Sequence, residues 1–353
     1  MQPITVFSLF DWMSCGRLAL ERAGIPVASY YASEIDRYAI EVSENNRPDV
    51  IQVGDVREIR VKSDIKAIGV VRRPDGDTNV YVGDNGLDLL IGGSPCQWFS
   101  SAGKGLNFSD PRSKLFFEFV RILNEAKPRY FLLENVKMKK DRQNIISEHL
   151  FGIQPVEIDS ALLSAQRRKR LYRVWKRNED WSYSQVEISQ PEDKGLLLKD
   201  IIQYKVEEWY YINQGKVKDT YTKQSNFLKK TLFNINPSGK GMNGNVYNTE
   251  HKSPTLTTNK GEWIKIIQLP RGKNIWGIME NKTPTLSANL WQHNNLLQEW
   301  YRVRRLTPIE CERLQTLPDD YTAGVSNSQR YKMLGNGWTV DVIAHIFREM
   351  FKD

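Results

Sequence analysis

A cysteine in a short rigid turn is the first residue of this sequence with the type and setting for chemistry. Cys96 follows an apolar run at 87–91, two glycines, a serine and a proline. The apolar run is typical of a buried parallel strand, the glycines permit a sharp turn, and the proline restricts the backbone before the thiol. Open α/β sheets bind ligands at the carboxyl ends of their strands, so Cys96 is a candidate nucleophile. The alternative is a small buried residue.

Acidic and basic side chains elsewhere in the sequence could serve such a thiol. Glu134 and Asn135 follow another short apolar run, so we expect them to reach the same crevice. The run Gln-Arg-Arg-Lys-Arg at 166–170 places Arg168 and Arg170 on one face of a strand, because strand side chains alternate. We expect both guanidinium groups to point into the site. A solvated surface run is the ordinary interpretation of such charges.

Hydrophobic spacing predicts the elements that position these groups. Short apolar segments recur between segments of helical spacing, which predicts a doubly wound parallel sheet of the Rossmann-like α/β class. Strands are expected at 4–10, 27–33, 50–53, 87–91 and 130–133, helices at 37–45 and 113–124, a hairpin within 61–86, and an antiparallel pair at 156–163 and 171–175.

Acidic residues follow the first three predicted strands. Asp11 comes after the first strand, Glu34 after the second and Asp55 after the third. This placement suits a nucleoside, because a carboxylate after the second strand can accept hydrogen bonds from ribose hydroxyls. Helix N-caps are the structural alternative for each of them.

The chain is long enough for two domains. Helical spacing fades near residue 177, and Asn, Thr, Gly, Lys and Trp become more frequent. We therefore predict a first domain from 1–176 plus 325–353, and a smaller β-rich domain from 177–324. The last stretch reads as a glycine turn at 335–337 followed by an apolar helix, which we expect to pack back on the first domain.

A weak internal repeat lies inside the predicted smaller domain. Lys-Ser-Pro-Thr-Leu-Thr at 252–257 recurs as Lys-Thr-Pro-Thr-Leu-Ser at 282–287. Two similar β-units side by side would explain it, and so would a structural duplication without a function.

Composition narrows the class of partner. The net charge of +8 and the pI of about 9.2 favour a polyanionic partner, with a generally cationic surface as the alternative. The three cysteines form no Cys-x-x-Cys pair and the four histidines have no zinc spacing, so no metal is expected. The sequence has neither a membrane-spanning apolar run nor a signal pattern. We expect a soluble, cytoplasmic chain.

Taken in order, these motifs resemble the cytosine-5 DNA methyltransferase family, of the prokaryotic or phage type. The resemblance covers nearly all of 1–176 and 302–353. The matching positions are the loop after the first strand, Glu34, Asp55, the Pro-Cys segment 92–97, Glu-Asn-Val at 134–136, Gln166, Arg168 and Arg170, the segment 305–308 with Glu310, Arg313 and Leu314, and Gly335 and Asn336 with Val340. Residues 8–11, 54–57 and 115–119 also resemble the mammalian de novo branch.

The resemblance implies a catalytic role for five of these residues. Cys96 would add to carbon 6 of a cytosine, and Glu134 would supply a proton or hydrogen bond at ring nitrogen 3. Arg170, with Arg168, would hold the base oxygen or Glu134 and lower the pKa of the thiol. Asn135 would orient the base edge. The cytosine must be flipped out of the duplex, because these atoms are inaccessible in stacked DNA.

The resemblance also implies S-adenosyl-L-methionine as cofactor and double-stranded DNA as partner of a monomer. Glu34 would hold the ribose, Ile35 would pack on the adenine, and Asp55 and Val56 would meet the adenine edge. The methionine part would be lined by Phe10, Asp11, Trp12, Met13, Ser14, Cys15 and Gly16, and the pocket would be closed by Asn336, Gly337 and Trp338. The expected DNA contacts are Gln97, Ser100, Lys104, Arg112, Thr255 and Thr285, with 177–324 as the target-recognition domain.

Trp12 is a departure from the family pattern, which has glycine there. A tryptophan could fill the methionine subsite, or could swing outward if its φ is negative. Three hypotheses follow: an active sequence-specific DNA methyltransferase, a DNA-binding relative with impaired or lost methyl transfer, and a tRNA-directed member. The long segment 177–300 argues against the third.

Overall fold

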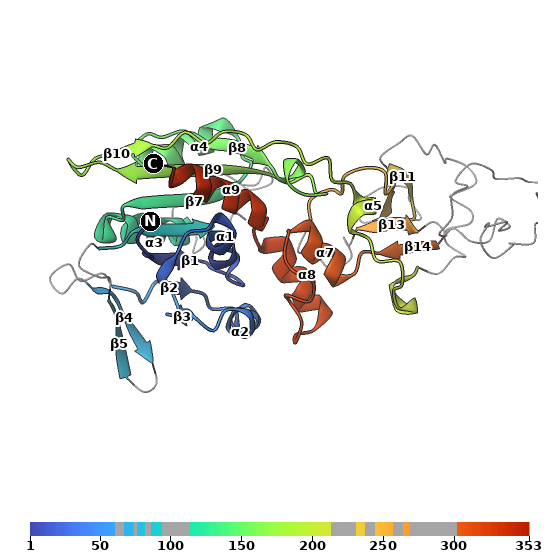
Figure 1. Ribbon diagram of the computed structural model, residues 1–353, viewed down its shortest axis with the longest axis horizontal. Coiled ribbons are helices and arrows are strands. Elements are labelled where there is room, and N and C mark those ends of the chain that lie inside the picture. Colours follow the sequence, from blue (N-terminus) through green and yellow to red (C-terminus); the bar gives the residue numbers. More distant parts are fainter. Residues whose placement is uncertain are drawn as a thin grey trace, which may run out of the picture.

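The computed structural model describes residues 1–60, 67–73, 76–81, 86–93, 113–212, 231–236, 244–256, 264–268 and 302–352. It shows a large α/β body and a smaller sheet, with α7 and α8 between them (Figure 1). The predicted site residues Cys96, Gln97, Ser100, Lys104, Arg112 and Thr285 lie outside the described residues, so their roles stay predictions.

The large sheet has eight strands in the order β10-β9-β7-β6-β1-β2-β3, with β8 paired to β9. The bounds are β1 Ile4–Leu9, β2 Val27–Ser33, β3 Val50–Gln52, β6 Leu89–Gly93, β7 Tyr130–Val136, β8 Val156–Asp159, β9 Lys169–Arg177 and β10 Tyr183–Gln185. The first five of these strands in the chain pair in parallel, and β8, β9 and β10 are antiparallel. Both the doubly wound α/β class and the antiparallel pair at its edge are confirmed.

Helices cover both faces of this sheet because the central strands are apolar on both sides. One core cluster joins α1 (Cys15–Ala23), α2 (Arg37–Asn46) and α9 (Val340–Met350) to one set of strand side chains. A second cluster joins α3 (Ser113–Ala126) and α4 (Lys140–His149) to the alternate set. The final helix packs against α1 as predicted, although the two lie at opposite ends of the chain (Figure 1).

Two local predictions need correction, and a third is confirmed. β7 continues to Val136, so Glu134 and Asn135 lie within the strand and not after it. The predicted glycine turn is instead the end of a helix, because α8 spans Asn327–Asn336 and only Gly337 follows it as C-cap. The hairpin predicted within 61–86 is confirmed as the antiparallel pair β4 (Ala67–Arg73) and β5 (Gly76–Tyr81).

The smaller sheet has the order β11-β12-β13-β14. Its strands are β11 Thr231–Asn234, β12 Asn245–Tyr247, β13 Lys265–Gln268 and β14 Arg302–Arg305. The short helices near it are α5 Leu198–Ile201, η2 Glu208–Tyr210 and α7 Pro308–Leu314. A further short helix, η1 Ser160–Leu162, follows β8 in the body. Two segments from within 177–324 also pack on the body, namely β10 on β9 and the apolar side of α7 in the cluster of α1 and α9. The predicted domain boundaries stay a prediction.

Candidate active site

An acid and a guanidinium meet at the carboxyl end of β7. Glu134 Oε1 lies 3.0 Å from Arg170 Nε, and the Glu134 side chain is 10% exposed. Glu134 pairs with Tyr172 across β7 and β9, so Arg170 is its diagonal neighbour on the same face of the sheet. The ion pair fixes the carboxylate at the end of the sheet, as the sequence predicted for Arg170.

Gly93 brings the end of β6 close to this acid. The two residues are register partners in the parallel pair of β6 and β7. A Cβ at Gly93 would lie 3.0 Å from Glu134 Oε2 and 2.9 Å from Trp338 Nε1. A side chain at this position would require Glu134 or Trp338 to shift. The chain therefore leaves β6 beside Glu134 at Gly93, three residues before Cys96 in the sequence.

Arg168 makes contacts that differ from its predicted role. Its Nη1 donates to Gly335 O at 3.1 Å and its Nη2 to Gly337 O at 3.0 Å. The side chain is buried, and this burial lowers the pKa of Arg168 to about 9. Both terminal nitrogens hold the end of α8, which is a positioning contact, and the expected contact of Arg168 with a base or with Glu134 stays a prediction.

Asn135 faces the opposite side of β7 from Glu134. Its Oδ1 accepts a hydrogen bond of 3.1 Å from Arg173 Nη1. Arg173 is fully buried and also donates to Gln143 O of α4, and burial lowers its pKa to about 10. Alternation along the strand accounts for this orientation. Asn135 therefore ties β7 to β9 and α4 through Arg173, and its role in orienting a base stays a prediction.

The loop after β1 is fixed from inside by Asp11. Its Oδ1 accepts from Tyr30 Oη at 2.7 Å and its Oδ2 from Ser14 Oγ at 2.6 Å. Burial raises the pKa of Asp11. Ser14 Oγ also lies 2.6 Å from Ser43 Oγ of α2. Tyr30 is a site residue that the sequence analysis missed, because nothing in an apolar strand shows which neighbour its hydroxyl meets.

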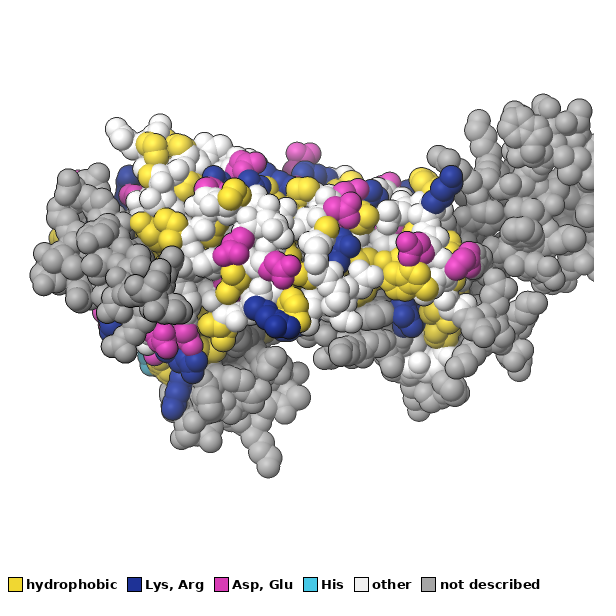
Figure 2. All heavy atoms as spheres, turned by 90° about the horizontal axis from the view of Figure 1, so that it is seen from below, with side chains coloured by type: hydrophobic (Ala, Val, Ile, Leu, Met, Phe, Trp, Pro, Cys, Tyr) yellow, Lys and Arg dark blue, Asp and Glu magenta, His cyan; other side chains and the backbone are white. Residues whose placement is uncertain are grey.

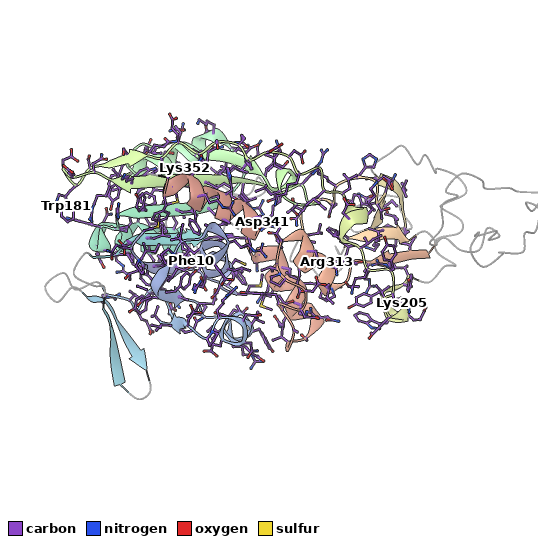
Figure 3. The ribbon with its side chains drawn as sticks, in the orientation of Figure 1. Phe10, Trp181, Lys205, Arg313, Asp341 and Lys352 are labelled. Carbon is purple, nitrogen blue, oxygen red and sulfur yellow. The ribbon has the colours of Figure 1, made fainter. Side chains whose placement is uncertain are left out.

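This loop has an unusual backbone. Phe10, Trp12 and Ser14 have φ of 59°, 54° and 57°, the left-handed region that favours glycine. The condition for an outward Trp12, a negative φ, is therefore not met. The Trp12 ring is half-buried and packs against the cluster of α1 and α9. Phe10 contacts the other cluster, and Figure 3 places it on the body.

Glu34 is held by backbone amides at the end of β2. Its Oε2 accepts from Trp12 N at 2.9 Å, and its Oε1 accepts from Ile35 N and Asp36 N at 2.7 and 2.8 Å. Burial raises the pKa of Glu34. Ile35 beside it is 68% exposed. The structure thus brings together the predicted acid, the loop after β1 and an accessible apolar side chain, which suits a nucleoside. An ion pair between Asp36 and Lys332 of α8, which the sequence analysis missed, lies next to them.

The end of α8 closes against the start of α1. A Cβ at Gly337 would lie 2.7 Å from Met13 Cε, and one at Gly16 would lie 3.4 Å from the Trp338 ring. The Trp338 amide donates to the Cys15 thiol, and burial raises the pKa of that thiol to about 12. Met13 and Cys15 are buried, while Asn336 and Trp338 are half-buried. The two predicted groups of cofactor residues therefore meet, and Cys15 is an inert structural thiol.

Asp55 and Val56 have structural contacts. Arg57 donates to both Asp55 oxygens, with Nε at 3.0 Å from each, and this lowers the pKa of Asp55. The Val56 side chain is buried in the cluster of α3 and α4. The predicted contact of these two side chains with the edge of an adenine stays a prediction.

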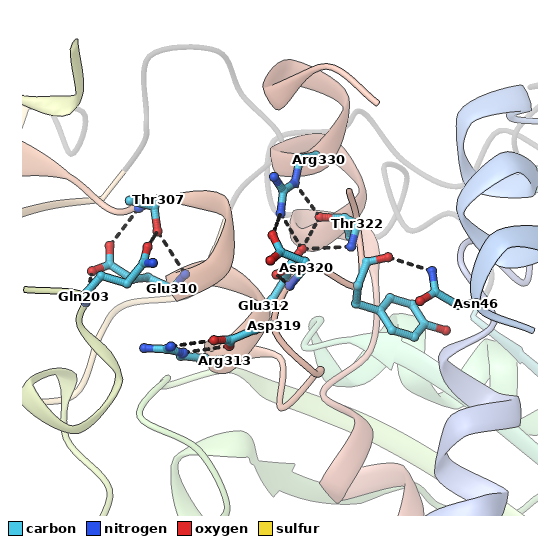
Figure 4. A network of polar contacts seen from close by, with 11 residues as sticks. Asn46, Gln203, Thr307, Glu310, Glu312, Arg313, Asp319, Asp320, Thr322 and Arg330 are labelled. Carbon is cyan, nitrogen blue, oxygen red and sulfur yellow. Dashed lines mark hydrogen bonds and ion pairs between the residues drawn. The ribbon is translucent and has the colours of Figure 1, made fainter. Parts of the chain in front are cut away.

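Buried polar contacts hold the start of α7, and Figure 4 shows those between Thr307, Glu310 and Gln203. Glu310 accepts from Arg304 Nη1 and Nη2 at 2.7 and 2.6 Å, from Thr307 N at 2.7 Å and from Gln203 N at 2.6 Å. The Arg304 and Glu310 side chains are completely buried. Thr307 caps α7, and Arg313 of the same helix lies between the body and the smaller sheet (Figure 3). The segment 305–314 is therefore held in place by a buried ion pair and by hydrogen bonds.

Charge is dispersed over the described part of the surface seen in Figure 2, where acidic and basic side chains alternate with apolar ones. Among the described residues, no group of three or more His, Cys, Asp or Glu side chains could hold a metal ion. The helices within the same described ranges are too short or too polar to cross a membrane.

The sheet order, the loop suited to a nucleoside and the acid–guanidinium pair beside the end of β6 define a methyltransferase. The model of the family of C-5 cytosine-specific DNA methylases matches residues 4–352. The chain therefore belongs to this family, the DNA cytosine-5 methyltransferases, as the resemblance predicted.

Relatives and solved structures agree with this membership. The chain is 32% identical to the orphan methyltransferase M.SPRI of Bacillus phage SPR, covering 99% of this chain and 98% of that relative. It is 31% identical to the type II methyltransferase M1.ScrFI of Lactococcus lactis subsp. cremoris, covering 92% and 72%. The fold is similar to the methyltransferase EhMeth of Entamoeba histolytica, with a TM-score of 0.66, 19% identity and coverage of 99% and 98%. It is also similar to the Dnmt2 methyltransferase of S. pombe, with a TM-score of 0.62, 16% identity and the same coverage.

Proposed function

We propose that the chain transfers a methyl group from S-adenosyl-L-methionine to carbon 5 of a flipped-out cytosine in a specific double-stranded DNA sequence. The observation that carries this proposal is the ion pair of Glu134 and Arg170 beside Gly93, where β6 leads toward Cys96. An acid and a guanidinium are the groups that a thiol addition to a pyrimidine requires.

The chemistry proceeds in two stages. The Cys96 thiolate adds to carbon 6 of the cytosine, and the electron pair of the ring double bond becomes available at carbon 5. Glu134 gives a proton or hydrogen bond to nitrogen 3, while Arg170 keeps the acid in place. Carbon 5 would then take the methyl group, and the cofactor sulfur would keep the electron pair of the bond that breaks. A base takes the proton from carbon 5, the ring double bond forms again, Cys96 leaves as a thiolate, and nitrogen 3 returns any proton it received to Glu134.

The residues at the ends of β1 and β2 fit the cofactor, which supplies an electrophilic methyl group when bound. Glu34 would hold the ribose through lone pairs that its amide donors leave available. The exposed Ile35 would pack on the adenine, and Asp55 and Val56 would lie at its edge. Trp12, in the loop after β1, and Trp338, after α8, would lie on either side of the methionine part.

DNA is the proposed partner, met by residues 177–324 as a target-recognition domain and by a catalytic domain of 1–176 plus 325–353. The family to which the chain belongs supports this assignment. We propose that the protein acts as a monomer in the cytoplasm of a bacterial or phage-infected cell.

A second candidate is a DNA-binding relative with impaired methyl transfer. The φ of 54° at Trp12 favours it, because a side chain now stands where the family has glycine. Calorimetric titration with S-adenosyl-L-homocysteine separates the two. Binding by the unmodified chain supports the enzyme, whereas binding only by Trp12→Gly supports the impaired relative.

Bisulfite sequencing of DNA from cells that express the chain tests the main proposal. We expect methylated cytosines in one short sequence context, and none in cells that express Cys96→Ser. Unmethylated DNA from the wild-type culture would contradict the proposal. Methylation of tRNA in place of duplex DNA would support the tRNA-directed alternative.

A further inference from the structure

The connection between β12 and β13 returns to the body at the segment that carries Arg168 and Arg170. Given the methyl transfer proposed above, we propose that residues 252–256, called the strap, position this arginine segment. Thr255 is the positioning residue. β12 and β13 pair in parallel, and parallel strands need a long connection. This length allows the connection to reach the body between the two strands.

The strap docks by its backbone. Ser253 forms a parallel bridge with Gln166. Ser253 N donates to Ala165 O at 2.7 Å, and Arg167 N donates to Ser253 O at 2.9 Å. Ser253 and Gln166 are completely buried, so water does not compete for these bonds.

Side chains of the strap add contacts on either side of this bridge. Thr255 Oγ1 donates to Arg167 O at 2.7 Å, and Leu256 N donates to Gln166 Oε1 at 3.4 Å. Lys252 Nζ binds the carbonyl of Ala161. The backbone on both sides of Gln166 is thus held by a segment that follows β12 of the smaller sheet.

The next residues of the same extended segment reach the site. Arg168 holds the carbonyls of Gly335 and Gly337, and Arg170 holds Glu134. A shift at 167 would move both arginines, because each residue of an extended chain advances only about 3.3 Å. The five residues 166–170 therefore connect the strap, the end of α8 and Glu134.

This arrangement gives Thr255 a role other than the predicted DNA contact. A residue that touches DNA sets the affinity for DNA. A residue that positions Arg170 sets the rate of methyl transfer at saturating DNA and cofactor, and leaves the affinity unchanged.

The test compares Thr255→Val, which keeps the shape and removes the donor, with Thr255→Ser, which keeps the donor. Lys199→Ala is a matched control, since Lys199 pairs with Glu250 just before the strap at 2.6 Å and that bond does not reach 165–170. We measure single-turnover methyl transfer, the Kd for DNA, and amide hydrogen exchange at 165–170. Thr255→Val should slow transfer about three- to tenfold, as expected for one hydrogen bond. Exchange should become faster and the Kd should not change, whereas both other variants should match the wild type.

Unchanged transfer and exchange in Thr255→Val would overturn the strap proposal. A rise in Kd that accounts for the slower reaction would assign Thr255 to DNA contact and would overturn it too. If the wild type methylates no DNA, the proposed function fails, and exchange at 165–170 still decides whether the strap holds this segment.

Discussion

Replacing Trp12 by glycine, and separately by alanine, distinguishes backbone strain from side-chain packing in the loop after β1. The φ of 54° costs an L-residue about 1–2 kcal/mol, which glycine avoids. Glycine in turn loses about 0.5–1 kcal/mol more backbone entropy on folding. Both variants lose the half-buried ring, worth about 1 kcal/mol, roughly half of a fully buried aromatic side chain. Trp12→Gly should therefore stay within about 1 kcal/mol of wild type, and Trp12→Ala should be about 0.5–1 kcal/mol less stable than Trp12→Gly.

Urea unfolding of the purified variants measures these differences. Trp181 provides a matched pair of control substitutions, since its φ is 67° and it lies at the far end of the body (Figure 3). The same order of glycine above alanine is expected there, with no change in binding of S-adenosyl-L-homocysteine. An alanine variant at position 12 as stable as the glycine variant would refute the argument, because the loop could then leave the left-handed conformation without cost.

Three further predictions concern buried charges and the acid of the site. Arg304→Ala leaves Glu310 buried without its cation and should lower the free energy of unfolding by about 3–5 kcal/mol. The double variant Arg304→Met with Glu310→Leu should lower the free energy of unfolding by less. A larger loss in the double variant than in Arg304→Ala would contradict this prediction. The raised pKa of Asp11 adds stability at low pH, and this stability is lost as the pH rises through the pKa of the folded state. Asp11→Asn should therefore gain stability relative to the wild type over that pH range. A difference in the free energy of unfolding between the two proteins that does not change with pH would contradict this prediction. Glu134→Gln should slow single-turnover methyl transfer by about 10²–10⁴-fold, while Glu157→Gln at the edge of the sheet should not; equal rates in the two variants would exclude the acid role.

The sequence was sufficient for the architecture because hydrophobic spacing reports burial directly. The seven residues of β2 match the predicted strand at 27–33, and the apolar stripe of the last helix required a sheet to cover. The pairing of Glu134 with Arg170 was expected from the resemblance to the family, whereas strand alternation alone predicted only that the guanidinium groups face the crevice.

Orientation within the site could not be predicted in the same way. Spacing places Arg168 and Arg170 on a common face, but it does not show that the carbonyls of Gly335 and Gly337 occupy the space before Arg168. The opposite orientation of Asn135 depended on β7 extending to Val136, and a polar pair after an apolar run resembles the start of a loop.

The packing of α9 on α1 has a consequence for synthesis in the cell. Val342, Ile343 and Phe347 of α9 are completely buried on a sheet face that is otherwise covered by the first helices of the chain. During synthesis, that face stays open until α9 has emerged from the ribosome. The body is therefore expected to finish folding only once α9 is available, which leaves the apolar face exposed to chaperones and proteases while the residues between α1 and α9 are made.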